Sequence, residues 1–148
     1  MNIDHVAIWT PNLEKLKDYY VKYFAGKSNT KYLNKETHFE SYFITFQSGT
    51  RLELMKKPGI SSNLNDPIDQ YQGIIHLSFN VETMDKVDEK LNMLRNDGFR
   101  ILRGPRKTGD GYYEFETLDP DNNRLEVMSI FKPQSPQRLS TKDSKRFK

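Results

Sequence analysis

The feature that most constrains the fold is an internal repeat that carries its ionisable residues with it. Two strand-like segments each contain one histidine, His5 and His76, and an amphipathic helical pattern follows each. Later in each half, a second strand-like segment carries one glutamate between aliphatic residues, at Glu53 and Glu126. The histidines are 71 positions apart and the glutamates 73. A repeat of this kind predicts two copies of one structural unit.

Each half predicts one helix and four strands in the order β-α-β-β-β. The first helical stripe runs from Leu13 to Phe24, after a cap at Thr10 or Asn12, and the second runs from Met84 to Leu94. The segments predicted as strands are 4–9, 28–33, 39–46 and 51–55 in the first half and 75–81, 100–102, 111–118 and 124–128 in the second. The fold class predicted is therefore α+β, built from two βαβββ modules.

The predicted domain covers residues 1–131, as modules 1–56 and 74–131 joined by a linker at 57–73. The linker contains two Pro and two Gly and lacks periodicity. Residues 132–148 contain six Lys or Arg and one Asp, and we expect them to form a disordered basic tail. The remaining 17 basic and 19 acidic residues make the domain slightly acidic, which argues against a specific nucleic-acid partner.

Composition excludes several further classes. The chain has no cysteine, so it has neither a disulfide framework nor a thiolate nucleophile. No apolar run approaches the roughly 18 residues that a membrane span needs, and no secretory pattern precedes the first strand. We therefore expect a cytoplasmic protein that acts on a small molecule and does not contact a membrane.

The strand pattern places the repeated His and Glu residues on one kind of face. Side chains alternate across a strand, so each of these strands has an aliphatic face, suited to pack under a helix, and an opposite face that carries the ionisable residue. Four strands can thus present His5, Glu53, His76 and Glu126 to one concave surface. The neighbours on these faces, which we expect to line a substrate cup, are Trp9, Met55, Ser78, Asn80 and Met128.

A divalent metal would account for this set of residues. Two inward carboxylates need compensation, and two imidazoles with two carboxylates form a ligand set that suits Zn, Ni, Co, Fe(II) or Mn. Taken singly, a histidine near a strand start is usually a hydrogen-bonded residue, and a glutamate alternating with leucines is usually solvated. The repetition of both at matched positions favours the metal site. Whether one chain or a dimer forms that site is left open by the sequence.

The pattern resembles the vicinal oxygen chelate superfamily, which includes glyoxalase I and the bleomycin-resistance proteins. The resemblance covers about residues 1–130 and depends on the segments 5–8, 52–54, 76–81, 104–105, 119–121 and 125–126, with the helix at 13–24. It implies that the two modules form an open, eight-stranded, barrel-like sheet around a central cup. It also implies one divalent metal per site and a homodimer.

By the same resemblance, His5, Glu53, His76 and Glu126 match the metal ligands of bacterial glyoxalase I (lactoylglutathione lyase). The implied activity is a metal-dependent lyase or isomerase reaction, in which metal-assisted proton transfer acts on a small substrate that chelates through its oxygens. Glu126 is the implied proton-transferring carboxylate and Glu53 its counterpart.

The chain departs from glyoxalase I at two positions. Trp9 stands where glutathione-binding relatives tend to have Arg, and Lys57 where they tend to have Asn, so no glutathione site is predicted. Two alternatives remain: an isomerase like methylmalonyl-CoA epimerase, whose relatives usually have Gln in place of Glu53, and a non-catalytic, antibiotic-type binding or sensing protein.

Overall fold

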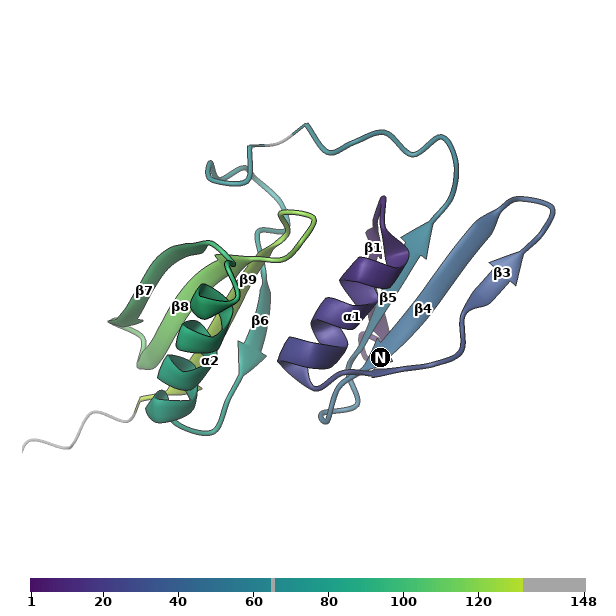
Figure 1. Cartoon of the computed structure of the whole chain (residues 1–148). Helices are drawn as coiled ribbons and strands as arrows, with labels where there is room; N and C mark the ends of the chain where they lie inside the picture. The colour runs from purple at the N-terminus through teal and green to yellow at the C-terminus, as the bar shows by residue number, and fades with distance from the viewer. Residues whose placement is uncertain (65, 132–148) are drawn as a thin grey trace, which may run out of the picture.

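The computed structural model describes residues 1–64 and 66–131. The predicted tail at 132–148 lies outside the described residues. The first module contains β1 (His5–Trp9), α1 (Leu13–Phe24), β2 (Lys27–Ser28), β3 (Tyr32–Asn34), β4 (Phe39–Thr45) and β5 (Arg51–Lys56). The second contains β6 (Leu77–Asn80), α2 (Met84–Asn96), β7 (Ile101–Lys107), β8 (Tyr112–Leu118) and β9 (Arg124–Ile130). The α+β class and the two βαβββ modules are confirmed (Figure 1).

The strands of the described residues form two separate sheets and no closed barrel. The first has the order β1-β5-β4-β2, with β3 paired to β4, and the second has the order β6-β9-β8-β7. In each, the first strand of the module pairs in parallel with the last, so β1 lies beside β5 and β6 beside β9. The predicted run 28–33 is split into β2 and β3, because Asn29 bonds through its side chain and backbone to Phe43.

Local sequence sets where both helices begin. The side chain of Asn12 accepts a hydrogen bond from the Lys15 N–H at 3.1 Å, and Thr83 does the same for Lys86 at 3.2 Å. Both are N-caps that satisfy a backbone donor in the first helical turn. The C-cap of α1 is Ala25, which takes the left-handed conformation at φ 53°. None of the described helices is long and apolar enough to span a membrane.

The core lies between the helices and the aliphatic faces of the sheets. Leu52, Leu54, Leu125 and Val127 are at most 2% exposed, as their alternation with glutamate predicts. α1 also contacts the second module, because the Tyr20 hydroxyl donates to the Asp119 carboxylate at 2.8 Å. The rings of Phe24 and Phe79 lie 4.3 Å apart across the same boundary. The helices thus cover one side of both sheets (Figure 1). Glu53 and Glu126 alternate with the buried residues of their strands and therefore lie on the other side.

Candidate functional site

The first module brings His5 and Glu53 together on the open face of its sheet. Their strands pair in parallel with Ala7 opposite Glu53, which leaves His5 Nε2 3.6 Å from Glu53 Oε2. The other ring nitrogen, Nδ1, lies 2.7 Å from the Asp4 carboxylate. Hydrogen bonds from His5 first, then from Arg51, lower the pKa of Asp4. A carboxylate on one nitrogen of a histidine fixes the ring, as it commonly does where the other nitrogen binds a metal.

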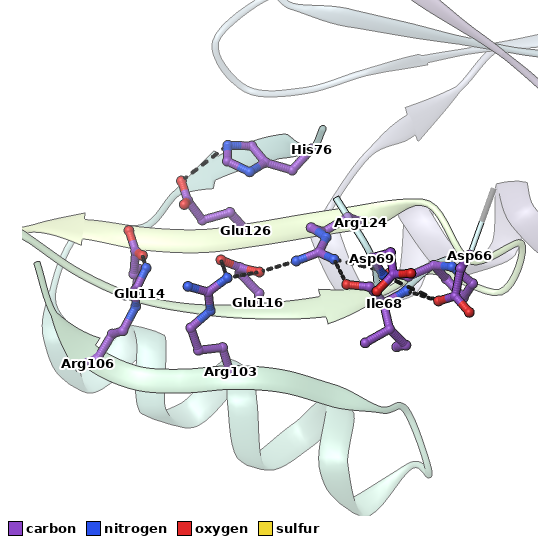
Figure 2. Close-up of polar contacts among 11 residues, drawn as sticks. Asp66, Ile68, Asp69, His76, Arg103, Arg106, Glu114, Glu116, Arg124 and Glu126 are labelled. Carbon is purple, nitrogen blue, oxygen red and sulfur yellow. Dashed lines mark hydrogen bonds and ion pairs between the residues drawn. The ribbon is translucent and has the colours of Figure 1, made fainter. Parts of the chain in front are cut away.

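The second module repeats this arrangement with His76 and Glu126. His76 comes directly before β6, and its Nε2 lies 3.8 Å from Glu126 Oε1 (Figure 2). The Ser78 hydroxyl, opposite Glu126 in the strand pairing, donates a hydrogen bond to the same oxygen at 2.7 Å. Both glutamate side chains are mostly buried, at 16% exposed for Glu53 and 15% for Glu126.

The separations within each pair fit two ligands of one metal ion. Metal–nitrogen and metal–oxygen bonds of about 2.1 Å allow two ligand atoms to lie at most about 4.2 Å apart. Both His–Glu distances fall within that limit. However, no group of three or more His, Cys, Asp or Glu residues that could hold a metal occurs in residues 1–64 and 66–131. The structure thus contains two matched His–Glu pairs and, within the described residues, does not bring all four predicted ligands together in one chain.

The other residues predicted for the cup lie on the same open faces. Trp9 is opposite Met55 in the pairing of β1 with β5, and Asn80 is opposite Met128 in that of β6 with β9. Ser78 has the additional contact with Glu126. His38, the third histidine, is exposed in the turn between β3 and β4.

The open face of the first module is largely aromatic. Phe43 lies opposite Glu53, and its ring is perpendicular to that of His5, with the ring centroids 5.2 Å apart. The Arg51 guanidinium lies 4.6 Å from the centroid of the Phe43 ring. Trp9 contacts Phe39 edge to face at 6.1 Å, and Lys57 Nζ lies 5.6 Å from the Trp9 ring centroid. Arg51 and Lys57 therefore each lie over an aromatic ring of this face.

The open face of the second module is charged instead, a feature that the sequence pattern did not predict. Glu114 and Glu116 on β8 are each 6% exposed and lie opposite Met128 and Glu126. Arg106 binds Glu114 at 2.7 Å, and Glu116 lies between Arg103 at 3.2 Å and Arg124 at 2.7 Å (Figure 2). Burial raises the pKa of Glu114 even though the adjacent Arg106 opposes the shift.

An irregularity in β7 places two arginines on this face. Arg103 and Arg106 are three residues apart, so a regular strand would send them to opposite sides. The register shifts once between Ile101 and Arg103 and again between Arg103 and Arg106, across Gly104–Pro105. Arg103 thus lies opposite Glu116 and Arg106 opposite Glu114. Gly104 has φ +93°, and a Cβ there would lie 2.6 Å from the Glu114 carbonyl oxygen. In the sequence, Gly104 is the one indication of this irregularity, since a glycine within a strand often marks a bulge or a close backbone approach.

Two cavities lie along the boundary between the modules. One, of about 280 Å³, is bordered by the linker, His76 and Arg124, and the other, of about 600 Å³, is bordered by Phe24, Phe79 and Asn80. Neither cavity is lined by Glu53 or Glu126. The two glutamates therefore lie on the open faces, outside both cavities.

Solved structures share this fold at low sequence identity. A glyoxylase/bleomycin resistance protein/dioxygenase domain from Frankia sp. EAN1pec is 22% identical, with a TM-score of 0.72 over 88% of this chain and 98% of that one. The trypanothione-dependent glyoxalase I of Leishmania major is 21% identical, with a TM-score of 0.70 over 87% and 86%. The fosfomycin resistance protein FosX from Listeria monocytogenes, in complex with Mn(II), is 16% identical, with a TM-score of 0.62 over 85% and 90%.

Sequence comparison gives the family directly. The uncharacterized protein YqjT of Bacillus subtilis (strain 168) is 35% identical over 60 residues, which are 38% of this chain. The chain thus matches about half (47%) of the length of that curated relative. The model of the Glyoxalase/Bleomycin resistance protein/Dioxygenase superfamily matches residues 2–127. With that match across nearly the whole described chain, and with the repeated βαβββ module, the protein belongs to this superfamily.

Proposed function

We propose that the protein is a divalent-metal-dependent, glyoxalase-like lyase or isomerase that acts on a small oxygen-chelating substrate. The observation that carries the proposal is the repetition of one His–Glu pair, at 3.6 Å and 3.8 Å, at equivalent positions of the two modules. Because each pair supplies only two ligands, we propose that His5 and Glu53 of one chain join His76 and Glu126 of a second copy. A homodimer would then contain two complete sites, or one metal ion per chain.

The donor set supports a divalent ion of borderline hardness. Two imidazole nitrogens and two carboxylate oxygens suit Zn, Ni, Co, Fe(II) or Mn, and four protein ligands leave one or two positions for a substrate. When bound, such an ion would supply the Lewis acid that polarises adjacent substrate oxygens. The related FosX structure contains Mn(II), which is consistent with a metal of this group.

The two glutamates are suited to different roles. Glu126 Oε1 accepts a hydrogen bond from Ser78 at 2.7 Å, which holds the carboxylate in one orientation toward the open face. Proton transfer needs a base within hydrogen-bond reach of the carbon-bound proton, so a held carboxylate is the better candidate. Glu53 has Ala7 and Phe43 at the flanking positions, and neither can hold its carboxylate. We therefore assign proton transfer to Glu126 and ligation without proton transfer to Glu53.

Two experiments test this proposal. Elemental analysis and calorimetric titration of apo-protein with Zn, Ni, Co and Mn should give about one ion per chain, and His76→Ala should abolish tight binding. Each metal form should then be assayed with a panel of α-hydroxy-carbonyl compounds, thiol adducts and CoA esters. Metal binding without turnover on any member would favour the non-catalytic binding protein. Full metal affinity in His76→Ala would show that the proposed site is wrong.

A further inference from the structure

The open face of the first module carries three neighbouring aromatic side chains beyond the His5–Glu53 pair. We call Trp9, Phe39 and Tyr32, on β1, β4 and β3, the aromatic wall. Trp9 and Phe39 lie 6.1 Å apart at 89°, and Tyr32 and Phe39 lie 6.1 Å apart at 57°. Trp9 is 39% exposed and Tyr32 54% exposed. Exposed aromatic rings that cluster on one face next to a candidate site indicate a ligand-binding surface.

A cation accompanies the wall. Lys57 follows β5 on the same face as Glu53 and Met55, and its Nζ lies 5.6 Å from the Trp9 ring centroid. Within the described part of the chain, no carboxylate forms an ion pair with Lys57. By contrast, Arg51 at the other end of β5 is paired with Asp4. The charge of Lys57 is therefore available to an anion that lies against Trp9.

The wall is within reach of a substrate that occupies the His5–Glu53 pair. Trp9 is four residues beyond His5 on β1, and Met55 is two residues beyond Glu53 on β5. At about 3.3 Å per residue, Trp9, which pairs with Met55, lies about 7 Å along the strands from Glu53 and about 13 Å from His5. A small molecule with its oxygens at the pair can extend over Met55 to Trp9 and Lys57.

We propose that the aromatic wall and Lys57 bind a planar aromatic ring that carries an anionic group, at the end of the substrate opposite its chelating oxygens. Aromatic faces pair favourably with aromatic rings, which accounts for the ring. The Lys57 ammonium, which has no ion pair among residues 1–64 and 66–131, accounts for the anion. This inference takes the position of the reacting end from the proposed function. The binding of the ring and of its charge is a property of the first module alone.

Trp9 is the only tryptophan in the chain, so its emission reports occupancy of the wall directly. Metal-free protein is titrated with benzoate, with benzamide (ring without charge) and with cyclohexanecarboxylate (charge without aromatic ring). We expect benzoate to change Trp9 emission and to bind at least about fivefold more tightly than either analogue. Equal affinity for all three probes, or no response to benzoate, would overturn the proposal.

Two variants test the residues named. Lys57→Gln should weaken benzoate about fivefold, to the level of benzamide, and leave benzamide unchanged. The matched control is Lys56→Gln, because Lys56 lies opposite Glu40 on the other face of the strand and should not change either probe. Phe39→Leu keeps the reporter and should weaken both ring-containing probes. Equal losses of benzoate binding in the Lys57 and Lys56 variants would contradict the assignment.

Failure here and failure of the proposed function can be told apart. The titration uses metal-free protein and is repeated with His76→Ala, which removes a proposed ligand from the other module. If the parent protein binds no added metal but both it and His76→Ala bind benzoate, the metal site is refuted and the wall is supported. One metal ion per chain without preference for an aromatic anion would support the metal site and refute the wall.

Discussion

The two modules share one backbone plan but surround their glutamates with different chemistry. Glu53 lies between Ala7 and Phe43 in the strand pairing, whereas Glu126 lies between Ser78 and Glu116 at the equivalent positions. The cross-strand partners of the first carboxylate are therefore apolar, whereas those of the second are a hydrogen-bond donor and another carboxylate. The repeat preserves the positions of the two His–Glu pairs, and the residues opposite each glutamate differ in chemistry.

The arginines that begin the two glutamate strands differ in the same way. Arg51 is 36% exposed and contacts Asp4 and the ring of Phe43. Arg124 is 6% exposed, binds Glu116 at 2.7 Å and donates to the carbonyls of Pro67 and Ile68 at 3.2 and 2.9 Å (Figure 2). Arg124 thus links the 57–73 segment to the second module by hydrogen bonds, whereas Arg51 lies at the surface of the first module.

The largest expected effect separates the two glutamates. Glu126→Gln keeps the shape and a neutral oxygen ligand but removes the basic charge, so any isomerase activity should fall by a factor of about 10² to 10⁴. Glu53→Gln should be milder, because we assign it ligation only. Steady-state rates of the parent and of both variants, corrected for metal content, measure these losses. Equal losses would mean that the two glutamates share the proton transfer.

The next effect compares the two arginines. Arg124→Leu leaves buried Glu116 with only the partly exposed Arg103, and removal of one partner of a buried pair typically costs about 3–5 kcal/mol. Arg51→Leu removes an exposed pair and should cost about 1 kcal/mol or less. Urea denaturation gives both free energies of unfolding. Similar losses would show that burial does not distinguish the two positions.

Ser78 and Ala7 occupy equivalent positions opposite the glutamates. Ser78→Ala removes the hydrogen bond that orients Glu126, and loss of such a bond to a metal ligand typically lowers metal affinity about tenfold or more. Calorimetric titration with Zn measures this loss. Ala7→Ser, which offers Glu53 a similar donor, is the matched control and should not weaken binding. Unchanged zinc affinity in Ser78→Ala would show that the Ser78 hydrogen bond does not distinguish Glu126 from Glu53.

The smallest effect concerns pH and the first module. Hydrogen bonds from Lys17 and then Lys31 lower the pKa of Glu14 from 4.5 to about 2. A pKa lowered by folding stabilises the protein above pH 4.5, and this contribution is lost as the pH falls toward 2. Glu14→Gln should therefore have a slightly lower melting temperature than the parent at pH 6, and the gap should close at about pH 2. A gap independent of pH would mean that the charge of Glu14 does not contribute.

Much of the fold follows from local pattern. The alternation around Leu52, Leu54, Leu125 and Val127 predicts which face of each strand is buried, and the structure confirms it. The helix at Leu13–Phe24 has the predicted bounds. Strand β7 spans Ile101–Lys107 and is longer than the predicted 100–102. The strand continues past Gly104–Pro105 because a register shift there keeps it paired with β8.

The site is less accessible to sequence reasoning. Alternation predicts the face of a side chain but not how two modules are placed, so it could not show that the His–Glu pairs stay apart in one chain. Arg103, Arg106, Glu114 and Glu116 were missed for a related reason. They have no counterparts in the first module, and the bulge at Gly104 breaks the period that would have assigned the two arginines to one face.

Complementation between two defective chains tests the central claim most directly. One variant carries His5→Ala with Glu53→Gln, and the other carries His76→Ala with Glu126→Gln. Neither alone should bind metal tightly. If sites are shared between chains, a mixed dimer combines the intact first module of one chain with the intact second module of the other. Calorimetry on the refolded mixture should then recover one ion per mixed dimer. A mixture that binds no more metal than its components would contradict a site built from two copies.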